Sequence, residues 1–465
     1  MVPNPENAFR KPLETAASIA LSYLAELDTR PVAPPAGLQE LRSRLTKPLN
    51  ETEMDAGQVI RELAADVEGG IMTSAGGRFF GWVIGGALPA ALGADWLTSA
   101  WDQNAGLYAA GPAAAIVEEV AGAWLKEIFG LPAAAGFALV TGCQMAHTTC
   151  LAAARHAVLR KYGWDVEERG LFGAPAIRVL SSTERHGTFE RAIRFVGIGR
   201  QQITCLPVDE QGKLRPEALE QALHGCADSP VIVLLQAGDV NIGAYDAFET
   251  LIPLAKRYGA WVHVDGAFGL WAAASPRFRH LVKGVEQADS WATDGHKWLN
   301  VPYDCGYAFV ADSEAHRGAM SFRAPYLTHG AEARDQMDWT PESSRRARGF
   351  ATYAALRQLG RHGIADLVER CSRHARALVT RIGSLPGAEL VWEPTINQGL
   401  VRFGDDRQTD QVIAAIAATG EAFFGGTTWR GRRAMRVSVS NWQTSEQDIE
   451  RVIAAISRVL QAYNK

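Results

Sequence analysis

The chain has 465 residues, of which 47% are hydrophobic and 21% are charged, and its formal net charge is −4. These values are typical of a globular protein, and the length is enough for two or three domains. The slightly acidic charge gives no electrostatic reason to expect nucleic acid or an anionic membrane as a partner.

The cysteines and the N-terminal residues both bear on the compartment. The six cysteines are scattered and none forms a C-x-x-C pair, so we predict reduced thiols in a cytoplasmic protein without a metal site. Residues 1–11 are polar and lack the apolar core of a signal peptide. The Ala/Gly-rich stretch 84–100 is interrupted by Pro89 and carries Asp95, so we expect no membrane-spanning segment.

Apolar residues at helical spacing predict helices over 13–28 and 56–68. The run at 76–82, Gly-Gly-Arg-Phe-Phe-Gly-Trp, is too irregular for a single element. It suits a loop that lines a pocket or crosses to a partner subunit, although core packing would account for each aromatic side chain equally well.

From about residue 113 to 310, short apolar or β-branched runs alternate with helical segments. Strands are predicted at 136–140, 177–181, 203–207, 231–236, 261–264, 290–293 and 306–310. Helices are predicted at 113–128, 144–161, 184–196, 215–224 and 246–258. This alternation predicts a mostly parallel α/β sheet, in which ligands bind in the loops that follow the carboxyl ends of the strands.

Residues suited to chemistry follow several of these strands. The turn at 141–147 opens a helix and offers backbone N–H groups to a phosphate, though any α/β crossover needs a similar turn. His186 follows the second strand and could stack on an aromatic ligand or cap a helix. Asp265 ends a strongly apolar strand, where a carboxylate is costly unless it has a cationic partner or caps a helix. Gly266 and Ala267 beside it leave room for a flat ring.

Lys297 lies in the run Thr-Asp-Gly-His-Lys-Trp-Leu-Asn at 293–300, away from any charged face. A partly desolvated lysine has a lowered pKa, and its amine is available to form a Schiff base with a carbonyl. A solvent-facing loop lysine is the alternative. Because the strands before Asp265 and Lys297 belong to one predicted sheet, the two side chains could face each other across its carboxyl edge.

Three motifs together carry a resemblance to a known family: His-Val-Asp at 263–265, Asp-Gly-His-Lys-Trp at 294–298, and His186 upstream. In this order the chain resembles the group II pyridoxal-phosphate decarboxylases, which include the aromatic L-amino acid, histidine, glutamate and tyrosine decarboxylases. The likeness extends from about Phe79 to the run at 436–442. The resemblance implies an α/β protein of the type I (aspartate aminotransferase-like) fold, with pyridoxal 5'-phosphate as cofactor.

The same resemblance implies three parts and a homodimer with shared active sites. Residues 1–95 would form a helical segment that packs on the partner subunit. Residues 96–345 would form the large cofactor-binding domain, and residues 346–465 a smaller α+β domain. The arginines at 345, 346 and 348, near this boundary, could bind a carboxylate or phosphate or could begin a solvated helix.

The resemblance also implies roles at the sheet edge. Lys297 would hold the cofactor as a Schiff base. Asp265 would pair with the pyridine nitrogen and keep it protonated, so that the ring acts as an electron sink. His186 would stack on one face of the ring, and Ala267 would support the other.

Other residues would complete the site. Backbone groups of Cys143 and Gln144 would bind the phosphate. His296 would help to position the Schiff base or the substrate carboxylate, and Asn241 would lie near the cofactor. Asp294 departs from the family, because several relatives have an asparagine there that contacts the phosphate. A second anion beside a phosphate is unfavourable, so we expect Asp294 to point elsewhere, to a backbone cap.

The run at 321–328 resembles the catalytic loop of the family, and Tyr326 matches the tyrosine that protonates the substrate Cα after carbon dioxide leaves. In relatives, phenylalanine at this place goes with aldehyde-forming oxidative chemistry. Tyr326 therefore favours simple decarboxylation, unless this tyrosine only packs the loop.

By the same correspondence, Phe80 and Trp82 fall on the wall of the substrate pocket. An aromatic-lined, apolar pocket suits an aromatic L-amino acid. An acidic substrate would need a basic residue, for which Arg78 is the nearby candidate. The remaining alternatives are an aldehyde synthase, an aminotransferase, or a non-catalytic protein of this fold.

Overall fold

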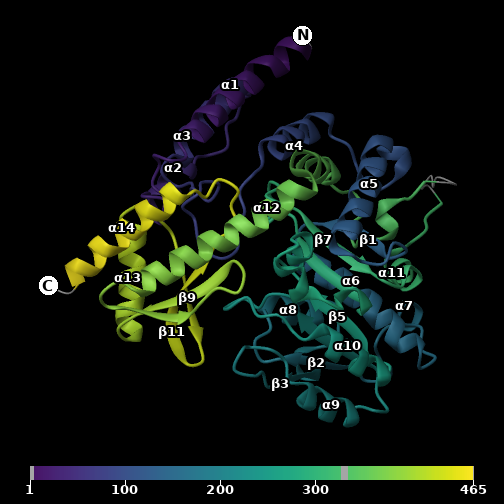
Figure 1. The fold of residues 1–465 in the computed structure, drawn as a ribbon. Coiled ribbons are helices and arrows are strands. Elements are labelled where there is room, and N and C mark those ends of the chain that lie inside the picture. Colours follow the sequence, from purple (N-terminus) through teal and green to yellow (C-terminus); the bar gives the residue numbers. More distant parts are fainter. Residues whose placement is uncertain (1–4, 326–332, 464–465) are drawn as a thin grey trace.

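The large sheet contains the strands that the alternating pattern predicted (Figure 1). The computed structural model describes residues 5–325 and 333–463, and within them seven strands lie in the order β1-β7-β6-β5-β4-β2-β3. Their bounds agree with the predicted strands to within one residue at each end. They are β1 (Gly136–Val140), β2 (Arg178–Ser182), β3 (Ile203–Leu206), β4 (Val231–Gln236), β5 (Trp261–Asp265), β6 (Ser290–Asp294) and β7 (Gly306–Val310).

The prediction of a mostly parallel sheet is confirmed, with β7 as the exception. The pairs formed by β2, β3, β4, β5 and β6 are parallel, whereas β7 is antiparallel to both β1 and β6. Only residues 295–305 separate β6 from β7, which is too short a connection for the crossover that a parallel pair needs.

Helices cover both faces of this sheet. Alternate residues of β4 point to opposite faces, so Val233 and Leu235 pack in one core cluster with α9 and α10, and Ile232 and Leu234 in another with α6 and α8. The helices around the sheet are α4 (Pro89–Trp101), α5 (Pro112–Phe129), α6 (Cys143–Arg160), α7 (Val166–Arg169), α8 (Gly187–Phe195), α9 (Pro216–His224), α10 (Phe248–Arg257) and α11 (Ser313–Met320).

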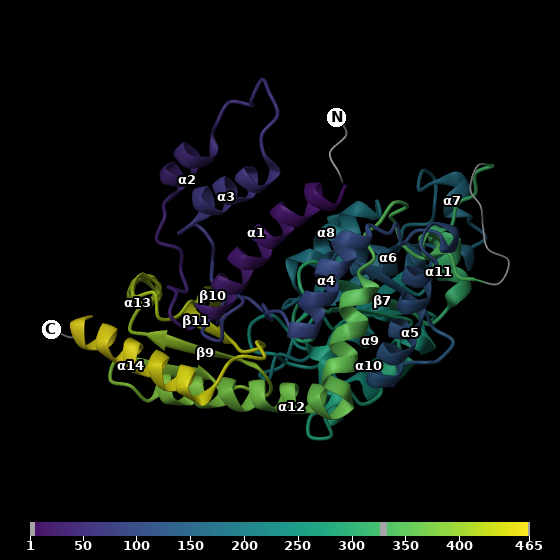
Figure 2. The same ribbon diagram turned by 90° about the horizontal axis from the view of Figure 1, so that it is seen from above.

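A smaller antiparallel sheet follows in the sequence, in the order β10-β11-β9-β8. The long helix α12 contacts α4 and α5 beside the large sheet and β8 and β9 of the small sheet, and Figure 2 shows it running between the two. The elements are α12 (Gly349–Gly383), β8 (Ala388–Trp392), β9 (Gln398–Phe403), α13 (Asp406–Ala418), β10 (Gly425–Trp429), β11 (Arg432–Ser438) and α14 (Glu446–Tyr463).

Before α4, the described residues form the helices α1 (Pro5–Ala25), α2 (Leu38–Leu45) and α3 (Ala56–Val67). Helix α1 begins before the predicted start at residue 13, and it pairs with α3 while its N-terminal end projects outward (Figure 1). None of the helices that the structure describes combines the length and apolar character that a membrane span needs.

The arginines at 345, 346 and 348 form ion pairs within the protein. The guanidinium of Arg345 is fully buried, lies 2.8 Å from Oε2 of Glu118 in α5, and donates to the carbonyl oxygens of Ala105 and Leu139. Arg346 pairs with Asp95 and Arg348 with Asp304. These side chains therefore bind carboxylates of the protein itself and join the start of α12 to the elements around it. The solvated helix start is wrong for the buried Arg345 and Arg348, whereas Arg346 is partly exposed.

Arg345→Met is expected to lower the free energy of unfolding by about 3–5 kcal/mol, because it leaves the Glu118 carboxylate buried without its cation. Arg346→Met is the matched control, since its partly exposed pair with Asp95 should contribute at most about 1 kcal/mol. Urea denaturation followed by tryptophan fluorescence measures both variants. Equal losses in the two variants would contradict the structural role given to Arg345.

Candidate active site

A pocket of about 570 Å³ lies at the carboxyl edge of the large sheet, where the sequence predicted the site. The start of α6, residues that follow β2, β5 and β6, the loop before α4, and β11 line this pocket. The predicted site residues on its wall are Trp82, Cys143, Gln144, His186, Asp265, Ala267, His296 and Lys297. A larger hollow of about 850 Å³ beside the end of α5 contains none of them.

Lys297 faces the pocket with its ammonium paired. Its Nζ lies 3.0 Å from Oδ2 of Asp294. Burial by itself would lower the pKa of Lys297, but the charge and hydrogen bond of Asp294, together with the nearby Cys143 and Asp265, outweigh burial, and the pKa is raised. The expectation of a lowered lysine pKa is therefore wrong, because the sequence alone does not reveal this ion pair. The lysine backbone is also closely packed: a Cβ at Gly85 would lie 1.9 Å from the Lys297 carbonyl oxygen, so only glycine fits there.

Asp294 ends β6 and faces the pocket. Its Oδ1 accepts a hydrogen bond at 2.5 Å from the backbone N–H of Cys143, the first residue of α6, and lies 3.4 Å from Nε2 of His296. The expected backbone cap is present, but the side chain does not turn away from the cofactor region as expected. Lys297 supplies the cation that makes an anion tolerable there.

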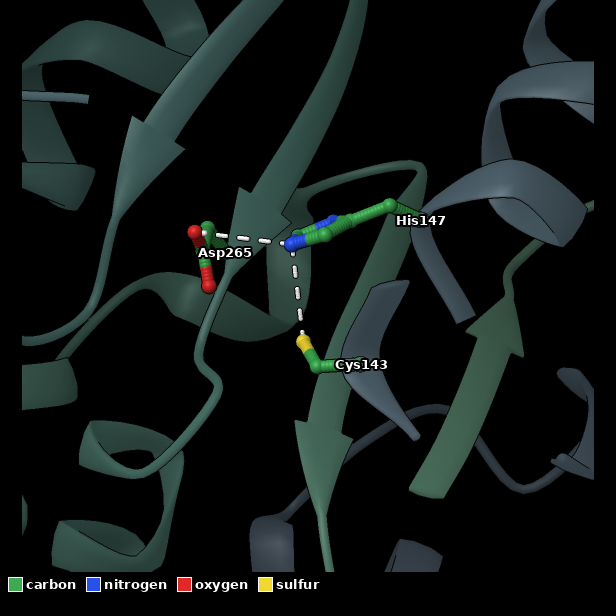
Figure 3. Close-up of side chains that lie close together, drawn as sticks. All are labelled: Cys143, His147 and Asp265. Carbon is green, nitrogen blue, oxygen red and sulfur yellow. Dashed lines mark hydrogen bonds and ion pairs between the residues drawn. The ribbon is translucent and has the colours of Figure 1, made fainter. Parts of the chain in front are cut away.

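Asp265 is buried at the end of β5 and is held by two donors (Figure 3). Its Oδ2 lies 3.5 Å from Nε2 of His147, and its Oδ1 accepts from the backbone N–H of Ala267 at 3.1 Å. Burial by itself would raise the pKa of Asp265, but His147 and these hydrogen bonds hold it well below the usual range. The carboxylate therefore remains ionised inside the protein.

His186 lines the pocket and also caps α8. Its Nδ1 accepts from the backbone N–H of Thr188 at 3.2 Å, and burial lowers the pKa of the ring. Helix capping and stacking on a ligand are therefore compatible roles for His186. The capping nitrogen lies on one edge of the ring, and the residue still lines the pocket.

His296 is oriented from two sides. Its Nδ1 accepts from the backbone N–H of Cys305 at 3.1 Å, and its ring stacks on Tyr303 with centroids 4.3 Å apart. Burial lowers the pKa of His296 below its usual value. A neutral ring with Nε2 toward Asp294 can donate a hydrogen bond to that carboxylate.

Some predicted residues are not on the pocket wall. Phe80 is fully buried against Phe424, and Asn241 accepts a hydrogen bond from Thr427 at 2.7 Å. Arg78 is buried and donates to the carbonyl oxygens of Asp28 and Arg30. Tyr326 lies outside the residues that the structure describes.

The structure adds three side chains that the sequence-based reasoning missed. Arg436 of β11 lines the pocket, donates to the Val240 carbonyl oxygen at 2.7 Å, and has a pKa lowered to about 10 by burial. Tyr303 stacks on His296, and His147 holds Asp265. His147 follows Cys143 by four residues, a spacing that places both on one face of α6. The predicted helix begins at residue 144, so this pairing was not considered.

A model of the pyridoxal-dependent decarboxylase conserved domain matches residues 39–404. The chain belongs to the pyridoxal-dependent decarboxylase family. Over 95% of its length this decarboxylase is 27% identical to tryptophan decarboxylase 1 of Oryza sativa, and the match spans 91% of that protein. Over 68% of its length it is 29% identical to the acidic amino acid decarboxylase GADL1 of Bos taurus, and that match spans 61% of the bovine protein.

Solved structures show the same fold. A crystal structure of Oryza sativa TDC with PLP and tryptamine superposes with a TM-score of 0.93 at 24% identity and covers all of both chains. A crystal structure of Rhodiola rosea 4-hydroxyphenylacetaldehyde synthase superposes with a TM-score of 0.87 at 21% identity and covers 97% of each chain. The prediction of the type I pyridoxal-phosphate fold is thus confirmed, and so is the predicted family.

The pocket of this decarboxylase fits pyridoxal 5'-phosphate, the cofactor of the family. Both polar atoms of the Gln144 amide are buried with no hydrogen-bond partner among the described residues, beside the N-terminus of α6, where an anion is favoured. Asp265 offers an ionised carboxylate to a protonated ring nitrogen, and Lys297 offers an amine. These groups therefore fit the chemistry of a phosphate, a pyridine ring and an aldehyde.

Asp294→Asn is expected to lower the pKa of Lys297, because the amide can still accept from Cys143 but no longer carries a charge. Each unit of lowering raises the neutral fraction of the amine about tenfold. Cofactor-free protein should then capture pyridoxal 5'-phosphate faster at neutral pH, and the midpoint of the rate–pH profile should move to lower pH.

Stopped-flow recording of the visible absorption of bound cofactor measures this rate. Asp289→Asn is the control, since Asp289 pairs with Lys256 outside the pocket. An unchanged midpoint in Asp294→Asn would show that the Asp294 carboxylate does not govern the protonation of Lys297.

Proposed function

We propose that this decarboxylase removes the α-carboxyl group of an aromatic L-amino acid and releases carbon dioxide and an amine. The observation that carries the choice of substrate is the apolar wall of the pocket, formed by Trp82, Val83, Ile84 and Phe268 close to Lys297. A flat, apolar side chain would bury its surface against this wall. The similarity to tryptophan decarboxylase 1 over nearly the whole chain supports the same choice.

Each side chain around the cofactor would have a separate role. Pyridoxal 5'-phosphate supplies an electron sink for the carbon that loses carbon dioxide. In our proposal Lys297 holds the cofactor covalently, Asp265 keeps the ring nitrogen protonated, and His186 and Ala267 confine the ring from its two faces. The start of α6, with Cys143 and Gln144, binds the phosphate.

Two further groups would handle the substrate and the proton. His296 lies between Asp294 and Tyr303, so its Nε2 is held in one orientation, suited to positioning a substrate carboxylate or the lysine amine. Tyr326 would deliver a proton to Cα after carbon dioxide leaves. This role rests on the resemblance of the loop at 321–328 alone.

An acidic amino acid is the alternative substrate, and one observation favours it. Arg436 places a guanidinium on the pocket wall, whereas Arg78, the basic residue considered from the sequence, is occupied elsewhere. Arginine binds carboxylates through paired N–H groups. The similarity to the acidic amino acid decarboxylase GADL1 points the same way.

A product screen decides between these substrates. The holoenzyme is offered L-tryptophan, L-tyrosine and L-phenylalanine against L-glutamate, L-aspartate and L-cysteine sulfinate, and carbon dioxide, amine, aldehyde and peroxide are measured. We expect amine and carbon dioxide in equal amounts, with kcat/KM at least about tenfold higher for the aromatic substrates.

Three variants serve as controls for the screen. Lys297→Ala should abolish turnover and the visible absorption of bound cofactor. Tyr326→Phe should lose amine and gain aldehyde with peroxide if Tyr326 is the proton donor. Higher kcat/KM for an acidic substrate, lost in Arg436→Gln, would replace the aromatic proposal with the acidic one. Aldehyde with stoichiometric peroxide from the wild type would make the protein an aldehyde synthase.

We also propose a homodimer in which the N-terminal helices pack on the partner subunit. Leu13 and Leu21 of α1 are 58% and 61% exposed, and Leu63 of α3 is 52% exposed. Apolar side chains gathered on projecting helices are typical of an interface. This surface belongs to the segment 1–95 that the resemblance assigns to the partner contact.

Sedimentation of the purified protein is expected to give twice the chain mass of 50.3 kDa. The double variant Leu13→Ser, Leu21→Ser should shift the protein toward the mass of one chain, while the matched variant Leu390→Ser, of a 40% exposed leucine on β8, should not. A wild-type protein that sediments as a single chain would refute the dimer.

A further inference from the structure

A continuous path of buried hydrogen bonds runs from Asp265 into the core beneath the pocket. Oδ2 of Asp265 lies 3.5 Å from Nε2 of His147, and Nδ1 of His147 lies 2.8 Å from Nε2 of His263. Nδ1 of His263 lies 2.9 Å from Oγ of Ser290. His147, His263 and Ser290 come from α6, β5 and β6, and each is fully buried.

The inner end of the path sets the direction of its protons. The indole Nε1–H of Trp261 can only donate, and it donates to Oγ of Ser290 at 2.9 Å. The Ser290 hydroxyl oxygen accepts from Trp261, and its own hydrogen can be donated to Nδ1 of His263, 2.9 Å away. Burial holds the pKa of His263 well below its usual value, which favours the neutral ring. With Ser290 as the donor to Nδ1, the one proton of this neutral ring lies on Nε2. In this arrangement the Nε2 proton of His263 is donated to Nδ1 of His147, and the N–H of His147 lies on Nε2.

Nε2 of His147 faces the carboxylate of Asp265, as Figure 3 shows, so a hydrogen on this nitrogen is directed at the carboxylate. The sulfur of Cys143 lies 3.4 Å from the same Nε2. Burial raises the pKa of Cys143 well above its usual value, so the group is a neutral thiol and competes weakly for this hydrogen. Asp265 is the stronger acceptor.

We infer that His147 is a positioning residue, oriented by its contact with His263, which in turn contacts Ser290, and that it holds the Asp265 carboxylate ionised and oriented for the ring nitrogen of the cofactor. This inference rests on the role proposed for Asp265. Without a donor at Nε2, a carboxylate at the end of a buried strand would lose a hydrogen bond to a charged group, and its protonated or rotated forms would become favourable.

A metal ion is the competing explanation for this cluster. Ligand atoms of Cys143, His147 and Asp265 all lie within 4.8 Å of one another. A metal would occupy the same Nε2 and the same carboxylate oxygen that the hydrogen bond already joins. The hydrogen-bonded path satisfies these side chains with the thiol protonated, and zinc binding would require the thiolate.

Two substitutions of His147 separate positioning from packing. His147→Gln keeps an N–H near the Nε2 position, whereas His147→Leu keeps similar bulk without a donor. Cofactor-free protein is titrated with pyridoxal 5'-phosphate, followed by tryptophan fluorescence and by the absorption spectrum of the bound cofactor. We expect the leucine variant to bind at least about tenfold more weakly with a shifted spectrum, and the glutamine variant to recover most of the affinity.

Ser290→Ala tests the inner end of the path. It should also weaken cofactor binding, but by less than His147→Leu does. His316→Gln is the control, because His316 is a fully buried histidine that bonds to the Trp339 carbonyl oxygen, away from the pocket. Thermal unfolding of each variant reports whether it folds. If His147→Leu does not fold, the cofactor affinities of His147→Gln and Ser290→Ala, compared with that of wild type, still test the inference.

Three results would overturn the inference. The first is unchanged affinity in His147→Leu and Ser290→Ala. The second is an equal loss in the leucine and glutamine variants. The third is stoichiometric zinc in the wild-type cofactor-free protein that disappears in His147→Leu. These binding measurements use no amino acid substrate, so they can be interpreted even if the proposed decarboxylation is wrong. Conversely, a negative result for His147 would not change the outcome of the product screen.

Discussion

The site depends on keeping an ionised carboxylate at the end of a strand in which every residue is buried. Asp265 closes β5 and is buried there, so the surrounding elements must supply donors to its carboxylate. His147 comes from α6 on one face of the sheet, and the backbone N–H of Ala267 comes from the turn after β5. The position of α6 therefore serves two purposes, since its first turn faces the phosphate region and its second turn holds Asp265.

The neighbouring strand β6 also ends in a buried carboxylate, which is compensated by different groups. Asp294 closes β6 and is compensated by Lys297, three residues later, and by the backbone N–H of Cys143. Two carboxylates thus lie at adjacent strand ends, one held by a histidine and the other by a lysine. Lys297, the lysine proposed to hold the cofactor, lies in an ion pair with Asp294, so its protonation is coupled to the charge at position 294.

Buried charge also organises the protein beyond the pocket. Arg345 is enclosed between Glu118 and the carbonyl oxygens of Ala105 and Leu139, close to the start of α12, the helix that reaches from the large sheet to the small one. Breaking one partner of such a pair leaves a charge without solvent or counter-ion. The arrangement ties the start of α12 to α5 and β1, and so supports the sheet edge that carries the site.

The sequence by itself determined the seven strands, the carboxyl edge as the site, and the family, because alternating apolar runs and short motifs are local properties of the chain. It also brought His186, Asp265 and Lys297 to that edge, since the carboxyl ends of parallel strands meet there. Only the tertiary structure determined which side chains interact at that edge. The ion pair of Asp294 with Lys297, the bond of His147 to Asp265, and the arrival of Arg436 from β11 depend on contacts between distant segments. The removal of Phe80 and Asn241 from the pocket wall has the same origin, because a side chain turns toward the pocket or the core according to the packing of its neighbours, and residue type alone does not specify that packing.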